Sequence, residues 1–282
     1  MMTKRRIPRM AILRDIQRQI QRQKEEKKKQ QKEVFEQVYN RPKEKAFSDI
    51  DQLNMDSFRA IPKSVILELG LSKAALAVYP VLCCEADFEK DEAFHISQAN
   101  IARFAGVSEN TVRNALKELE NAGLLIKEKV TDGPRHFYVY KVRRPESEAN
   151  EQYGEAIYFY NCIIDNGIWA ELKPRAKVLY LTLRAVAKQD FELYSVIEWE
   201  VYERDWTGVN YDDYIRNRKW DVCDISLSKL CKLAKIERTN LTPILEELER
   251  YKLIERVGQW TKVYLKPGRL LRHKTLTSKI AY

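Results

Sequence analysis

The stretch that decides the fold is IARFAGVSENTVRNALKELENAGLL, residues 101–125. Gly106 lies within this stretch, and a glycine backbone readily adopts the positive φ that a tight turn requires. Ser108 follows at the place of an N-cap, where a serine side chain accepts a hydrogen bond from a backbone N–H of the next turn. Val112, Leu116 and Leu119 recur at i, i+4 and i+7, the spacing of one buried helical face. The stretch therefore predicts a short helix, a tight turn and a longer amphipathic helix.

This pattern occurs twice in the chain. Residues 96–126 and 225–255 align without a gap at a constant offset of 129 positions, with eight identical residues among 31. The apolar residues of the preceding helix, from Leu71 to Leu82, match residues 101 positions later. The two offsets differ because the second copy carries an insertion at about 191–222. Such self-similarity indicates two structural units of one kind.

Each copy is followed by a predicted β-hairpin, Leu125–Val142 around Asp132-Gly133 and the shorter Ile254–Leu265 around Gly258. The sequence thus predicts a mainly helical α+β fold with small sheets. We expect a basic helical or disordered arm at 1–50, a first unit at 51–145, a second unit at 155–268 and a basic tail at 269–282.

The second copy departs from the first at its turn. Lys235 replaces Gly106, and Glu237 replaces the capping serine. Pro243 is tolerated only in the first turn of a helix, where its missing N–H is not needed. We therefore expect a turn that is built differently and a third helix that begins late, capped by Asn240 or Thr242.

The first copy resembles the bacterial winged helix-turn-helix family over the whole of residues 101–125. The lead-ins FRAIPKSVILELGLSKAALAVYPVL (58–82) and FYNCIIDNGIWAELKPRAKVLYLTL (159–183) resemble plasmid replication initiators and phage replisome organisers of Gram-positive type. This similarity covers Phe58–Val142 well and Phe159–Lys266 loosely, and residues 1–50 lie outside it. It implies two tandem winged-helix domains that bind double-stranded DNA.

In a winged helix the third helix enters the major groove and the hairpin, or wing, contacts the backbone or the minor groove. The resemblance implies a set of base-reading candidates near the start of each third helix: Asn110, Thr111, Arg113, Asn114, Arg238, Thr239, Asn240 and Thr242. It implies a second set for the backbone and the wings: Lys117, Lys127, Lys129, Arg135, His136, Lys232, Lys235, Arg256, Gln259, Trp260 and Lys262. Arg suits guanine and Asn suits adenine, by bidentate hydrogen bonding.

The charge distribution agrees with a nucleic-acid partner. The formal net charge is +9, and residues 1–45 hold 15 Lys and Arg against six acids. Residues 256–282 hold seven Lys and Arg and no acid. Basic extensions on an otherwise neutral body are typical of nucleic-acid binding, because each cation that sits on a phosphate releases a counterion. Residues 7–39 indicate a basic helical arm, and a disordered tail is the alternative.

Other classes of protein find little support. The chain has no apolar run long enough for a membrane span and no secretory signal, and its five cysteines lack CxxC spacing, which indicates the cytoplasm. It has three histidines and no Gly-rich phosphate loop, HExxH or GxSxG, so we expect no enzyme, no catalytic residue, no metal site and no cofactor. The aromatic, acidic insertion favours core packing or a protein contact.

Three functions remain open. The first is a plasmid or phage replication initiator that binds repeated origin sites and contacts replisome proteins through the insertion or the N-terminal arm. The second is a transcriptional regulator. The third is an assembly factor whose winged helices bind protein. A homodimer is compatible with each of them, and a membrane partner is not expected.

Overall fold

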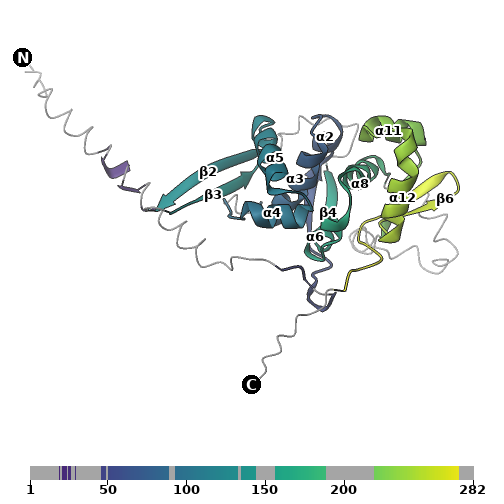
Figure 1. Cartoon of the computed structure of the whole chain (residues 1–282), viewed down its shortest axis with the longest axis horizontal. Coiled ribbons are helices and arrows are strands. Elements are labelled where there is room, and N and C mark those ends of the chain that lie inside the picture. The colour runs from purple at the N-terminus through teal and green to yellow at the C-terminus, as the bar shows by residue number, and fades with distance from the viewer. Residues whose placement is uncertain are drawn as a thin grey trace, which may run out of the picture.

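A computed structural model describes residues 46–48, 50–88, 93–132, 135–143, 156–188 and 219–272, with residues 19, 21–23, 25, 26 and 29 of the N-terminal region. The protein combines helices with small antiparallel sheets, which confirms the expected α+β class. The β2–β3 hairpin extends from one end of the body, and β6 lies toward the opposite end (Figure 1).

The three main helices and the hairpin of the first copy lie where the sequence predicts them. The short η1 (Ile50–Gln52), β1 (Phe58–Pro62) and α2 (Lys63–Leu67) come before three helices and a hairpin: α3 (Lys73–Glu85), α4 (Gln98–Ala105), α5 (Glu109–Asn121), β2 (Leu125–Asp132) and β3 (Arg135–Val142). Ser97 and Ser108 cap α4 and α5, because each side chain accepts a hydrogen bond from the backbone N–H three residues on.

The second copy follows the same order. Strand β4 (Ala156–Tyr160) and two single-turn helices, α6 (Cys162–Asp165) and α7 (Ile168–Glu171), come first. The main elements are α8 (Pro174–Val186), β5 (Trp220–Cys223), α11 (Leu227–Ala234), η3 (Arg238–Asn240), α12 (Leu241–Arg250), β6 (Ile254–Val257) and β7 (Trp260–Tyr264). Strand β7 lies between β5 and β6 in a three-stranded sheet.

The expectation of a different turn in the second copy is wrong. Lys235 has φ 51° and ψ 47°, and Gly106 has φ 61° and ψ 42°, so both turns use the left-handed conformation. That conformation costs a non-glycine residue only about 1–2 kcal/mol. The expected late start of α12 is confirmed, since η3 precedes it, but the Asn240 side chain makes no capping hydrogen bond. It donates instead to Glu237 Oε2 at 3.1 Å.

The lead-in segments pair with each other, which the sequence did not predict. Strands β1 and β4 form a two-stranded antiparallel sheet, with Phe58 opposite Tyr160 and Pro62 opposite Ala156. Each copy thus supplies one strand, and the buried side chains Ile61 and Phe159 join the sheet to the core.

One hydrophobic core extends through both copies. Helices α3 and α8 pack against each other between the two units (Figure 1). Trp169 of α7 is fully buried, and its Nε1 donates to the carbonyl oxygen of Ala77 in α3 at 2.9 Å. The ring of Phe159 meets the same indole edge-on. Buried contacts therefore fix the position of one copy relative to the other.

A pair of glutamates explains part of the internal repeat. The Glu118 carboxylate of α5 accepts hydrogen bonds from the backbone N–H and the hydroxyl of Ser72, both at 2.6 Å, just before α3. The matching Glu247 of α12 accepts from the backbone N–H of Lys173, at 2.7 Å, just before α8. In both copies a glutamate of the third helix thus binds the start of the first helix.

Two buried cations distinguish α8 from α3. Arg184 forms an ion pair with Asp221 at 3.0 Å and donates to the carbonyl oxygen of Tyr158 at 2.9 Å. Lys177 is fully buried and donates from Nζ to the carbonyl oxygen of Leu172. Burial disfavours its charged form and lowers the pKa of Lys177 from 10.5 to about 8.

Segments near both ends of the described body are hydrogen-bonded to one residue between α6 and α7, Asn166. Asn166 accepts a hydrogen bond from the backbone N–H of Leu271 at 2.7 Å and donates to the carbonyl oxygens of Leu271 and Ser48. The segments leading to the two basic extensions therefore meet there. Most of the N-terminal arm, the 144–155 linker, the insertion through residue 218 and residues 273–282 lie outside the described residues.

Candidate nucleic-acid interface

Helix α5 exposes a polar stripe along one face. Val112, Ala115, Leu116 and Leu119 are buried in the core. On the opposite side the exposed residues follow at i, i+3, i+4 and i+7, and they are Asn110, Arg113, Asn114 and Lys117. This stripe carries two cations and two amides that can each donate hydrogen bonds.

The start of α5 has a defined geometry. The Ser108 hydroxyl accepts from the backbone N–H of Thr111 at 3.2 Å and lies 2.8 Å from the Thr111 hydroxyl. Thr111 is half-buried, and its hydroxyl lies against the capping Ser108 rather than fully in solvent. Among the four base-reading candidates of the first copy, Asn110, Arg113 and Asn114 are the exposed ones.

Arg113 reaches from α5 toward the start of α4. Its Nε donates to Gln98 Oε1 at 3.3 Å, and its guanidinium lies 3.9 Å from Glu109 Oε2. The Arg113 side chain remains 59% exposed. An exposed ion pair of this length contributes about 0.5 kcal/mol, so a DNA base or phosphate can replace it at little cost.

The hairpin of the first copy places two lysines on β2. Lys127 lies over the ring of Tyr138, with Nζ 4.3 Å from the ring centroid. Lys129 is exposed and pairs in register with Tyr138. Arg135 and His136 begin β3, and their side chains lie outside the described part of the structure.

The third helix of the second copy presents a different surface. At the positions that match Asn110, Arg113, Asn114 and Lys117 it has Thr239, Thr242, Pro243 and Glu246, all exposed. The stripe has lost both cations and gained an acid. A duplex phosphate would be attracted to the α5 stripe and repelled by this one.

Cations of the second copy lie beside α12 rather than on it. Lys232 of α11 and Lys235 of the turn are exposed. Arg238 of η3 is also exposed, and it donates to the Ser228 hydroxyl at 2.7 Å. Lys232 and Lys235 lie outside the third helix, and Arg238 lies in the η3 turn that leads into it.

Most candidates in the second hairpin have partners within the protein. The Arg256 guanidinium group donates two hydrogen bonds to the Glu249 carboxylate, at 2.9 and 2.7 Å, and this contact lowers the pKa of Glu249. Lys262 Nζ lies over the rings of Trp220 and Trp260 and 3.7 Å from Glu255. Gln259, at the tip of the hairpin, is exposed.

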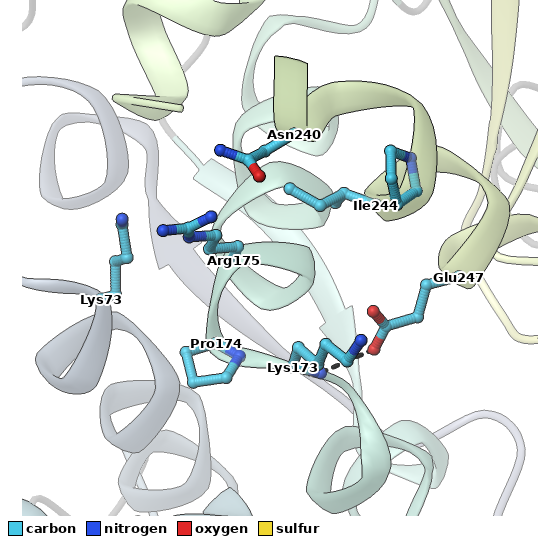
Figure 2. Close-up of a pocket in the computed structure, with 8 residues that line it drawn as sticks. Lys73, Lys173, Pro174, Arg175, Asn240, Ile244 and Glu247 are labelled. Carbon is cyan, nitrogen blue, oxygen red and sulfur yellow. Dashed lines mark hydrogen bonds between the residues drawn. The ribbon is translucent and has the colours of Figure 1, made fainter. Parts of the chain in front are cut away.

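The sequence did not single out a cleft between the two copies. The cleft has a volume of about 430 Å³, and its lining includes Lys73 at the start of α3, Lys173 and Arg175 at the start of α8, and Asn240 and Glu247 beside or on α12 (Figure 2). The repeat already matched the two helix starts, since Ser72 corresponds to Lys173. Only the packing of α3 against α8 brings these positions together.

A comparison with protein-family models matches residues 69–125 to a helix-turn-helix domain. The chain contains a helix-turn-helix domain. Such domains bind DNA, and the match covers α3, α4 and α5, whose exposed stripe is described above. No curated protein and no solved structure matches the chain.

Two kinds of site are absent from the described part of the chain. No group of three or more His, Cys, Asp or Glu there could hold a metal ion. No described helix is long and apolar enough to cross a membrane.

Proposed function

We propose that this protein binds specific sequences of double-stranded DNA through two winged helices in one chain, as a replication initiator of a plasmid or phage. The observation that carries the proposal is the exposed stripe of Asn110, Arg113, Asn114 and Lys117 on the third helix of a helix-turn-helix domain. These side chains are exposed where a recognition helix contacts DNA.

In this proposal α5 lies in the major groove. Arg113 donates two hydrogen bonds to a guanine, and Asn110 or Asn114 pairs with an adenine. Lys117, one turn further along the helix, contacts a phosphate. Lys129 of the β2–β3 wing contacts the backbone beside the groove.

The second copy then binds with less base reading. Its stripe of Thr239, Thr242, Pro243 and Glu246 has no cation, and its exposed Lys232 and Lys235 suit phosphates. We propose that this copy fixes the position of the protein on the DNA, while the first copy supplies most of the sequence preference.

The role in replication rests on two supports. The lead-in segments resemble those of plasmid initiators, and the buried packing of α3 against α8 holds the two units at one spacing. A fixed spacing suits two contact regions about one helical turn, roughly 10 bp, apart on the same duplex.

Selection of bound sequences from a random duplex pool tests this function. We expect one strongly preferred half-site for the first copy and a weaker preference about one helical turn away. In the source genome, matches should recur as repeats near an origin. A single match that overlaps a promoter would indicate a transcriptional regulator, and failure to enrich any sequence would indicate an assembly factor that binds protein.

A further inference from the structure

The lining of the cleft between the two copies carries three cations and one carboxylate, Glu247. Lys73 is half-buried, and Lys173 and Arg175 are exposed. Within the described part of the chain, no carboxylate forms an ion pair with any of the three. Figure 2 shows the Lys73 ammonium group and the Arg175 guanidinium group turned toward the same opening. An excess of cations along a concave surface raises the local potential and attracts anions.

Part of the backbone at the two helix starts is already hydrogen-bonded within the protein. The Ser72 hydroxyl accepts from the N–H of Ala75, and Glu118 accepts from the N–H of Ser72. Glu247 accepts from the N–H of Lys173, and Pro174 has no N–H to donate. The Glu247 carboxylate is thus directed at the backbone. The charged donors in the cleft are the side chains of the cations.

The cleft borders the third helix of the second copy, and one of its lining residues, Lys73, is next to a residue that α5 contacts. Pro243 of α12, which matches Asn114 of α5, is part of its lining. In the first copy, Glu118 contacts Ser72, next to Lys73, and Asn114 lies one helical turn earlier on the same face of α5. The cleft therefore lies between the two surfaces that are candidates for contact with DNA.

We propose that this cleft is a phosphate-binding site, and that its occupant is the DNA backbone between the segments contacted by the two third helices. This inference rests on the proposed function. A guanidinium group can bind two phosphate oxygens at once, and an ammonium group adds a point charge. Lys73 and Arg175 each neutralise one phosphate in this arrangement. They add affinity and salt dependence but no sequence preference.

The test compares the full-length chain with its Lys73→Gln/Arg175→Gln variant on a selected duplex over a range of salt concentrations. The slope of log K against log salt changes by about 0.9 for each phosphate contact. We expect the slope of the variant to be smaller in magnitude than that of the wild type by about 2. Its affinity should fall by the same factor for every duplex sequence. The control is Lys188→Gln/Lys252→Gln, which removes the same charge from exposed sites outside the cleft lining.

Equal slopes for the cleft variant and the control would overturn the proposal. If the wild type binds no duplex at low ionic strength, the proposed function itself fails. Thermal unfolding with inorganic phosphate or ATP then tests whether the cleft binds phosphate groups. A rise in the melting temperature of the wild type, absent in Lys73→Gln/Arg175→Gln, would support a phosphate site filled by a free ligand. No rise would overturn it.

Discussion

In the proposed function, the exposed residues of α5 divide into those that distinguish bases and those that bind phosphate. Arg113 and Asn114 are exposed near the start of the helix, and Lys117 lies one turn further on. Because the matching positions of α12 are Thr242, Pro243 and Glu246, the contrast between the two copies lies in single side chains on similar backbones.

Replacing Arg113 by Ala should weaken binding to the preferred duplex by about 1–3 kcal/mol and relax the preference at one base position. Lys117→Ala is the matched change on the same helix. It should weaken all sequences alike and reduce the salt slope by about 1. Competition binding with single-base variants of the duplex measures both effects. Equal losses on every variant for Arg113→Ala would show that Arg113 reads no base.

Lys177 should make stability depend on pH. Its pKa is lowered from 10.5 to about 8 in the folded protein, so the unfolded chain holds this proton up to a higher pH. Below about pH 8 the folded protein buries a charged ammonium group, and this lowers the free energy of unfolding by its full amount. The penalty disappears as the pH rises toward 10.5, because the folded protein then buries the neutral amine.

Lys177→Met should raise the free energy of unfolding at pH 7 by up to about 3 kcal/mol, since the buried charge is removed and a similar volume remains. The gain should shrink between pH 8 and 9.5, where the tyrosines are still protonated. Urea unfolding at several pH values measures it. A constant difference between variant and wild type across this range would contradict a depressed pKa.

At the scale of elements, the two turns share one backbone conformation but differ in their surroundings. A Cβ on Gly106 would lie 1.9 Å from the carbonyl oxygen of Ala170 in the second copy. Lys235 occupies the same position of the other turn and is exposed. Glycine is therefore required in the first turn by the contact with Ala170, and it is dispensable in the second.

Gly106→Ala should destabilise the protein by about 3 kcal/mol, from the left-handed conformation and the clash together. Lys235→Gly is the matched change and should stay within about 1 kcal/mol of the wild type, because relief of strain is offset by a more flexible unfolded chain. Chemical unfolding of both variants checks this. Equal effects would mean that the Ala170 contact is not maintained.

The sequence was sufficient for the main helices and the hairpins, but not for the lead-in strands β1 and β4 or for the contacts between elements. Periodicity and capping residues predicted α4, α5 and the β2–β3 hairpin, because these depend on neighbours in the chain. The absence of glycine at Lys235 was misleading, since a strain of about 1–2 kcal/mol is small beside the packing of a whole unit. Local patterns also could not show that Arg256 is held by Glu249, or that Lys73 and Arg175 line one cleft.

At the scale of the whole molecule, a single core should make the two copies unfold together. Asp221→Asn removes the buried negative charge that pairs with Arg184 and should cost about 3 kcal/mol or more. Asp224→Asn, which breaks the exposed pair with Lys188, should cost less than about 1 kcal/mol. Hydrogen exchange should show reduced protection in α5 as well as in α8 for Asp221→Asn. Unchanged protection in α5 would show two independent units.

The most direct test of DNA recognition is the affinity ratio between a selected duplex and a scrambled duplex of the same length, at low and at moderate salt. For the wild type we predict a ratio well above tenfold at both, with absolute affinity falling steeply as salt rises. For Arg113→Ala/Asn114→Ala the ratio should approach one, while Lys252→Gln retains the wild-type ratio. A wild type that does not distinguish the two duplexes, or a double variant that distinguishes them equally well, would contradict recognition by α5.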